Sequence, residues 1–201
     1  MFTGIITHSG EFREIRGGGK ELLVRAAELV PRVRPGDSIA VDGVCLTVVR
    51  SQGDTLAFDL SRETRERTTL GSLRAGARLN LELPLTLCAP LGGHLVAGHV
   101  DYTAKLLRAV PRRPGRRLAF GLPAAYRPFF IDKGSVAVNG ASLTVAALGP
   151  ASFEVELIPV TLDKSNLGTL RTGSSVNVEC DMIGKYVYNF FRGKVVPDGF
   201  R

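Results

Sequence analysis

Two pairs of small polar side chains have a spacing that lets both members project from one face of a β-strand. Cys45 and Thr47 lie two residues apart, and so do Ser142 and Thr144. Successive side chains of a strand point to opposite faces, so each pair would line up on one side. A thiol and hydroxyls can hydrogen-bond a polar ligand at a barrel mouth, although threonine is also an ordinary strand residue. The spacing predicts two polar pockets, with structural strand positions as the alternative.

The segment GGHLVAGH carries two imidazoles, those of His94 and His99. The two stand five residues apart, which suits neither one face of a strand nor one face of a helix, so a shared metal ion is not expected. Histidine is the natural proton carrier near neutral pH, which makes His99 a candidate proton donor or acceptor. Cys45 is a candidate reactive group, although a buried structural thiol is the commoner role for a single cysteine.

Cysteine spacing and the absence of known motifs exclude several classes of protein. Cys45, Cys88 and Cys180 are widely separated with no CxxC pair, which predicts neither a disulfide framework nor a thiol-rich zinc site. The sequence contains no GxxxxGK[ST], no GxGxxG after a strand, no GxSxG and no HExxH. Phosphate-loop, Rossmann, hydrolase-elbow and metalloprotease functions are therefore not expected, and no metal is predicted.

The charge and hydropathy of the chain narrow the choice of partners. The 201 residues are 44% hydrophobic and carry a net charge of +7. Much of the positive charge lies in Arg112, Arg113, Arg116 and Arg117, among proline and glycine residues typical of an exposed loop. No aromatic residues interleave with these arginines as a nucleic-acid stacking platform requires, so no nucleic-acid partner is expected.

No apolar run reaches the length of about 18 residues that a membrane-spanning helix needs. The first residues carry neither the basic region nor the apolar region of a secretion signal. We therefore expect no membrane association and a cytoplasmic location.

The chain contains an internal repeat. GDSIAVDGVCLTVV from Gly36 aligns with KGSVAVNGASLTVA from Lys133, and the alignment continues without a gap to TLGSLRAGARLNLE and NLGTLRTGSSVNVE. It pairs Cys45 with Ser142, Thr47 with Thr144 and Thr64 with Thr161. With a short gap, TGIITHSGEF faces AGHVDYTAKL, which puts Ile5 opposite His99. Duplication of one unit explains this self-similarity.

Each repeat has the alternation and turn residues of short β-strands. Asp42-Gly43 and Asn139-Gly140 separate β-branched runs and predict hairpins. Short strands over about 90 residues in each repeat indicate a small closed β-barrel. We divide the chain into two barrel units, residues 1–91 and 92–182, and a helix and tail over 183–201. Strands are predicted at 38–41, 45–49, 56–60, 78–83, 153–157 and 175–180, and short helices at 63–70 and 162–167.

The C-terminal segment has a helical pattern. Ile183, Tyr186, Val187 and Phe190 recur at i, i+3, i+4 and i+7, which is an apolar stripe about two turns long. So short a helix is marginal alone and must pack on another surface. Packing on its own barrel and packing on other subunits both remain open.

Several of these motifs, in this order, resemble the riboflavin synthase family of the α-chain type over nearly the whole chain. They are MFTGI, DGVCLTV, GGHLVAGHVD, KGSVAVNGASLTV, LIPVTL and VECDMIGKY. The resemblance implies an all-β fold of two tandem six-stranded Greek-key β-barrels plus a short C-terminal helix. It also implies a transferase of riboflavin biosynthesis, which moves a four-carbon unit between two molecules of 6,7-dimethyl-8-ribityllumazine. The products are riboflavin and 5-amino-6-ribitylaminouracil, and no cofactor is needed.

The family further implies a homotrimer held by the C-terminal helix, with each active site between the N-terminal barrel of one subunit and the C-terminal barrel of its neighbour. Association with lumazine synthase is a further expectation. The residues that match the family's site fall into two groups. Catalytic candidates are Cys45, His99, Ser142 and Thr144. Substrate-binding candidates are Phe2, Thr3, Gly4, Ile5, Ser38, Thr47, Thr64, Lys133, Ile158, Thr161 and Asp181, of which Phe2 and Thr3 are expected beside the N-terminal pocket.

The sequence departs from the family pattern at two positions. Val160 stands where the second repeat usually has glutamate, and Ala97 where serine is common. The alternative function is a non-catalytic lumazine- or flavin-binding protein of the same fold. Such relatives tend to lose reactive residues in one repeat, whereas Cys45, His99 and Ser142 are present here. The sequence therefore favours the enzyme.

Overall fold

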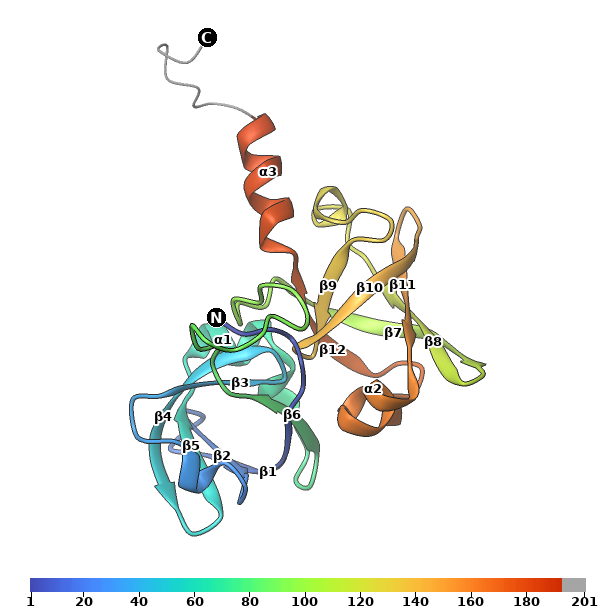
Figure 1. Cartoon of the computed structure of the whole chain (residues 1–201). Coiled ribbons are helices and arrows are strands. Elements are labelled where there is room, and N and C mark those ends of the chain that lie inside the picture. Colours follow the sequence, from blue (N-terminus) through green and yellow to red (C-terminus); the bar gives the residue numbers. More distant parts are fainter. Residues whose placement is uncertain (193–201) are drawn as a thin grey trace, which may run out of the picture.

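Twelve strands form two closed antiparallel β-barrels in the computed structural model, which describes residues 1–192 (Figure 1). The first barrel, which we call the N-barrel, has the strand order β1-β2-β5-β4-β3-β6, and β1 closes it against β6. The second repeats this order as β7-β8-β11-β10-β9-β12. Neighbours that are not consecutive in sequence make both Greek keys, so the predicted fold is confirmed. The N-barrel strands are β1 (His8–Arg16), β2 (Glu21–Arg25), β3 (Ser38–Val41), β4 (Val44–Gln52), β5 (Thr55–Asp59) and β6 (Arg78–Glu82).

The second barrel, which we call the C-barrel, has its strands within residues 102–180 and is followed by helix α3 (Met182–Arg192), which begins one residue before the predicted 183. Residues 193–201 of the predicted helix and tail lie outside the described residues. Arg112, Arg116 and Arg117 belong to the strands of a tight hairpin rather than to the predicted loop, and Arg117 pairs with Glu154. Within residues 1–192 no helix has the length and apolar character needed to cross a membrane. The C-barrel strands are β7 (Tyr102–Arg112), β8 (Gly115–Gly121), β9 (Ser135–Val138), β10 (Ala141–Leu148), β11 (Ser152–Leu157) and β12 (Ser175–Cys180).

A short helix precedes the last strand of each barrel, at boundaries that differ from the predicted ones. In the N-barrel, α1 (Arg62–Arg67) begins behind Ser61, whose side chain accepts from the Thr64 N–H. In the C-barrel, α2 (Pro159–Lys164) starts three residues before the predicted helix, because proline suits a first helical turn. Thr68 and Ser165 adopt extended backbone angles and end both α-helices. The chain continues in 3-10 turns, η2 (Thr69–Ser72) and η4 (Asn166–Thr169), and further turns are η1 (Val30–Arg32) and η3 (Arg127–Phe129).

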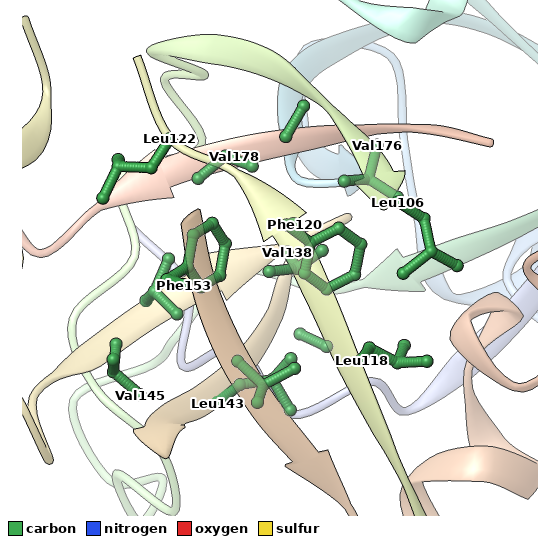
Figure 2. Close-up of a cluster of buried hydrophobic side chains, with 14 of the residues drawn as sticks. Leu106, Leu118, Phe120, Leu122, Val138, Leu143, Val145, Phe153, Val176 and Val178 are labelled. Atoms are coloured by element: carbon green, nitrogen blue, oxygen red, sulfur yellow. The ribbon is translucent and has the colours of Figure 1, made fainter. Parts of the chain in front are cut away.

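Side chains fill the interior of each barrel. In the C-barrel, Phe120 and Phe153 are fully buried with ring centroids 5.5 Å apart, and leucine and valine side chains surround them (Figure 2). The N-barrel is filled in the same way around Phe58. Burial of each such large side chain stabilises the fold by about 1.5–3 kcal/mol. A ligand therefore cannot enter either barrel, and its site must lie on an outer wall.

The two barrels meet at their matching hairpin turns. Asp42 and Asn139 have positive φ angles of 46° and 44°, and Gly43 and Gly140 follow them at 77° and 78°, as the predicted tight turns require. A Cβ atom added to Gly43 would lie 2.6 Å from the Gly140 nitrogen. Only glycine permits so close a backbone approach. The turns therefore lie back to back, and the barrels are related by an approximate two-fold axis.

Buried amides join the barrels around these turns. Asn80 Nδ2 donates to the Asn139 carbonyl at 2.9 Å, and Asn177 Nδ2 donates to the Asp42 carbonyl at 2.9 Å. The two bonds connect equivalent positions of the two repeats in opposite directions. All four residues are at most 3% exposed. Unpaired amides at this depth would be costly, so the bonds fix the relative orientation of the barrels.

Asp42 is the one carboxylate in this network, because its counterpart in the second repeat is Asn139. Its Oδ1 accepts from the Asn80 backbone N–H at 2.8 Å and from Asn166 Nδ2 at 2.9 Å. Asn139 Oδ1 accepts from the Asn177 N–H at 2.8 Å in the same way. Burial raises the pKa of Asp42 from 3.8 to about 7, although these two bonds partly oppose the shift.

Helix α3 follows β12 and projects away from both barrels (Figure 1). Lys185 Nζ pairs with Asp101 Oδ2 at 2.6 Å, and the Tyr188 ring packs edge-on against Phe129 with centroids 5.0 Å apart. The predicted apolar stripe lies on the opposite side, where Tyr186 is 72% and Phe190 65% exposed. The stripe therefore does not pack on its own barrel.

We predict that Asp42→Asn removes a pH-dependent loss of stability. Folded Asp42 keeps its proton to about pH 7, whereas the unfolded residue releases it near 3.8, so the free energy of unfolding falls as pH rises between these values. The slope is about 1.4 kcal/mol per pH unit. At pH 8 the variant should exceed the native protein by roughly 2–4 kcal/mol. Urea unfolding of both proteins at pH 5 and pH 8 measures this difference in the free energy of unfolding. The contributions of other titrating groups are the same in both proteins and cancel.

Asn139→Asp is the matched control for this prediction. It places a carboxyl group at the equivalent buried position, so its stability should fall more steeply with pH than that of the native protein. Parallel pH profiles for the native protein and Asp42→Asn would contradict the assignment.

Candidate functional site

Of the pockets on the outer walls of the barrels, two contain predicted site residues, one on each barrel. The N-barrel pocket has a volume of about 270 Å³ and lies between β4, α1 and the chain that leads into β7. The C-barrel pocket, of about 280 Å³, lies between β10, α2 and the chain that leads into β1. Val44, Cys45, Ser61, Glu63, Thr64, Arg67, Thr68, Gly98, His99 and Val100 line the first. Ala141, Ser142, Ile158, Val160, Thr161, Lys164, Ser165, Gly4, Ile5 and Ile6 line the second.

These two sets correspond one to one under the internal repeat. Taken in the orders just given, each residue of the first set aligns with the residue at the same place in the second. Cys45 thus matches Ser142, and His99 matches Ile5. The approximate two-fold axis therefore relates the pockets as well as the barrels. The chain carries two versions of one binding site.

The entry segment of each repeat crosses to the other repeat's pocket. Gly98 precedes the C-barrel, but its carbonyl accepts from the Cys45 N–H of the N-barrel at 2.8 Å. Gly4 precedes the N-barrel, and its carbonyl accepts from the Ser142 N–H at 2.7 Å. Both glycines have positive φ and lie against a strand of the other repeat. A Cβ atom added to Gly98 would lie 2.6 Å from Cys45 Cβ, and one added to Gly4 would lie 2.6 Å from Ser142 Cβ. Each pocket is therefore assembled from both repeats.

Two buried glutamates hold the crossing segments. Glu82, in β6, accepts from the Thr3 N–H at 2.7 Å, the Thr3 hydroxyl at 2.6 Å and the Gly4 N–H at 3.0 Å. Glu179, in β12, accepts from the N–H groups of Ala97 at 2.7 Å, Gly98 at 2.9 Å and His99 at 3.1 Å.

Burial raises the pKa of both carboxyls, and the donated bonds partly offset this effect. Sequence reasoning overlooked this pair. Its signal was an acidic residue at the same place in both repeats, in NLE and NVE.

His94 gives the C-barrel pocket a feature that the N-barrel pocket does not share. Its Nδ1 lies 2.7 Å from Ser142 Oγ, and its backbone N–H donates to the Thr3 carbonyl at 3.1 Å. Burial lowers the pKa of His94, while the charge of Asp181 raises it. The sequence analysis noted His94 but predicted no contact for its side chain. Gly93 makes the contact possible, since an added Cβ would lie 2.2 Å from the Thr3 oxygen.

Most of the predicted site residues lie at these two pockets. Cys45, Thr64 and His99 line the N-barrel pocket. Gly4, Ile5, Ser142, Ile158 and Thr161 line the C-barrel pocket. Both sets lie on outer walls and not at the barrel mouths, because core side chains fill the interiors.

Two terminal residues lie elsewhere than expected. Phe2 is fully buried with Ala40, Val96 and Ala137 between the barrels, and its N–H donates to the Val96 carbonyl at 2.7 Å. It can support a site but cannot touch a ligand in this structure. Thr3 was expected beside the N-barrel pocket, but its carbonyl accepts from His94 beside the C-barrel pocket. The crossing of the N-terminal segment accounts for both positions.

The remaining candidates lie outside the two sets of lining residues. Ser38 pairs with Thr47 across β3 and β4, and Thr144 with Ser135 across β9 and β10. Lys133 is exposed at φ 62°, and its Nζ donates to the Ala146 carbonyl at 3.3 Å. Asp181 Oδ1 accepts from the Ile183 N–H at 2.9 Å at the start of α3. Among residues 1–192 no cluster of three potential metal ligands occurs.

Comparison with known proteins identifies relatives over nearly the whole chain. The lumazine binding domain family model matches residues 3–84 and again 97–181. The riboflavin synthase of Mycobacterium tuberculosis is 42% identical over 96% of this chain and 98% of its own length. That of Bacillus subtilis is 36% identical over 94% of this chain and 89% of its own length.

Solved structures agree with the sequence matches. LumP complexed with riboflavin matches at a TM-score of 0.82 and 26% identity, over 90% of this chain and 99% of LumP. LumP complexed with 6,7-dimethyl-8-(1'-D-ribityl) lumazine matches at a TM-score of 0.79 and 25% identity, over 89% of this chain and 98% of LumP.

We predict that Glu179→Gln loosens the segment that crosses to the N-barrel pocket. The amide NH₂ faces backbone N–H groups that need an acceptor, so the free energy of unfolding should fall by about 1–3 kcal/mol. Hydrogen exchange should accelerate at Ala97, Gly98 and His99. Glu82→Gln is the matched variant and should act on Thr3 and Gly4 instead. The same exchange pattern in both variants would show that the carboxylates do not act locally.

Proposed function

Since the chain belongs to the riboflavin synthase family of lumazine-binding proteins, we propose that it converts two molecules of 6,7-dimethyl-8-ribityllumazine into riboflavin and 5-amino-6-ribitylaminouracil. The single observation that carries this proposal is the one-to-one match of the two pockets. A reaction between two copies of one molecule needs two similar sites, one for the donor of the four-carbon unit and one for its acceptor. The atoms of two lumazines balance those of the two products, so no oxidant or co-reactant is required.

The differences between the pockets supply the chemical asymmetry of the proposed reaction. The C7 methyl group of the lumazine is acidic because its anion is delocalised into the ring. His99 in the N-barrel pocket would face the C-barrel pocket of the next subunit in the assembly proposed below, and is a candidate carrier for the proton of the lumazine held there. Cys45 or water is a candidate nucleophile at C7. The hydrogen bond between His94 and Ser142 offers a second proton path in the C-barrel pocket. Holding two rings in register contributes several kcal/mol more.

A non-catalytic lumazine-binding protein is the second candidate, and the likeness to LumP favours it. Against it, the riboflavin synthases have higher sequence identity, 42% for the protein of Mycobacterium tuberculosis. Cys45, His99, Ser142 and Thr144 are also all present. Turnover separates the two functions, because both bind the same ligand.

We further propose that the active chain is a homotrimer in which the N-barrel pocket of one subunit meets the C-barrel pocket of the next. The exposed apolar stripe on α3 supports this assembly, since Tyr186 and Phe190 are 72% and 65% exposed. A contact between copies would remove the stripe from water and complete each site. Association with lumazine synthase and a cytoplasmic location remain predictions, and gel filtration of the mixed proteins tests the association.

The first test of the function mixes the protein with 6,7-dimethyl-8-ribityllumazine and no cofactor. We expect catalytic formation of riboflavin, followed by its absorbance, with one molecule of the pyrimidine for every riboflavin formed. Tight binding without turnover would instead support the LumP-like function. Absence of binding would contradict both.

We predict that His99→Ala slows turnover far more than it weakens binding. Loss of a proton-transfer group costs roughly a hundredfold in rate, while the exposed ring contributes little contact area. Stopped-flow turnover and equilibrium fluorescence titration measure the two quantities. Ile5→Ala changes the equivalent position of the C-barrel pocket and should mainly weaken binding. Equal losses of rate and affinity in His99→Ala would contradict the role.

We predict that Val187→Glu dissociates the trimer, because it places a charge in the middle of the apolar stripe. Sedimentation equilibrium should find a trimer for the native protein and a smaller species for the variant. Asn189→Glu, outside the stripe, should remain trimeric. A monomeric native protein at working concentration would contradict the assembly.

A further inference from the structure

The helix that lines each pocket carries a cationic side chain at the equivalent position. The neighbouring residue one turn earlier differs between the two helices. In α1, Arg67 lies one turn after Glu63, and the two side chains form an ion pair at 3.1 Å. In α2 the equivalent residues are Lys164 and Val160. Among the described residues 1–192, Lys164 makes no ion pair. The repeat has thus kept the positive charge in both pockets and its neutralising partner in only one.

Other lining residues also make the C-barrel pocket more apolar than the N-barrel pocket. Ser61 and His99 of the N-barrel pocket become Ile158 and Ile5 in the C-barrel pocket. Of the ten residues that line the C-barrel pocket, Lys164 alone is charged. The other titratable groups around this pocket are Glu82, which accepts from the Gly4 N–H at 3.0 Å, His94, which contacts Ser142, and Asp181, whose charge acts on His94. A ring that covers apolar walls excludes water and strengthens the field of the one cation beside it.

We propose that Lys164 makes the C-barrel pocket selective for the deprotonated form of its lumazine substrate. In that form the C–H bond of the C7 methyl group has broken, the electron pair has spread into the ring, and the proton has passed to solvent. The negative charge resides largely on ring nitrogen and carbonyl oxygen, which an ammonium group can contact. The N-barrel pocket, whose Arg67 is neutralised by Glu63, binds the neutral molecule. Lys164 is therefore a specificity-determining residue, and this inference rests on the proposed function.

The absorbance spectrum of bound 6,7-dimethyl-8-ribityllumazine, followed from pH 6 to pH 10 with the full chain, tests the proposal. In the native protein one bound component should ionise about one pH unit below the free ligand, a roughly tenfold preference for the anion. Lys164→Met should abolish this acid shift, and Lys164→Arg should retain it.

Two further variants give the matched comparison. Val160→Glu recreates in α2 the ion pair of α1, and it should abolish the shift with Lys164 still present. Val160 is 55% exposed, so the fold tolerates the change. Arg67→Met removes the cation of the other pocket and should leave the shift in place.

The outcomes separate this inference from the function on which it rests. If the native protein forms riboflavin and binds the ligand, but Lys164→Met and Val160→Glu titrate as the native protein does, the selectivity of Lys164 is wrong and the function stands. A shift that disappears in Arg67→Met and persists in Lys164→Met would assign the anion to the N-barrel pocket and overturn the proposal. If the native protein neither binds nor converts the lumazine, both proposals fail.

Discussion

The back-to-back contact of two glycine turns is the constraint on which the rest of the structure depends. Gly43 and Gly140 bring the barrels together at backbone distance, and Asn80 and Asn177 then reach across to carbonyl groups of the opposite turn. Side chains larger than hydrogen at these turns would separate the barrels and leave the amides buried without partners. Because this contact sets the approximate two-fold axis, it also sets where the entry segments cross. The pockets are a consequence of the axis.

Crossing of the entry segments couples each pocket to both barrels. Glu82 and Glu179 are strand residues whose carboxylates satisfy five backbone N–H groups of segments that have no regular secondary structure of their own. Neither barrel alone could hold its pocket, because one wall arrives from the other repeat. A duplicated chain therefore gains something that two separate copies lack, namely two sites in a fixed geometric relation.

Much of the fold could be predicted from the sequence, because the repeat and the Asp42-Gly43 and Asn139-Gly140 turns are local signals. The pairing of Cys45 with Ser142 and of Thr64 with Thr161 followed from the same alignment. The crossing did not, and the family resemblance alone placed Thr3 beside the N-barrel pocket, whereas its carbonyl accepts from His94 beside the C-barrel pocket. Buried Phe2 and the contact between His94 and Ser142 depend on it and were missed for that reason. Local sequence patterns do not predict which distant segments come into contact in the folded chain.

Equivalent backbone with unequal side chains is what a reaction between two identical substrates demands. Two identical sites would bind both molecules in the same state, and neither would be favoured as donor or acceptor. Here the residues that hold the backbone are kept in both repeats, as with Gly4 and Gly98 or Glu82 and Glu179. The residues that face a ligand have diverged, as with Ile5 and His99. The conserved positions fix where two rings lie, and the divergent positions determine which ring reacts as which.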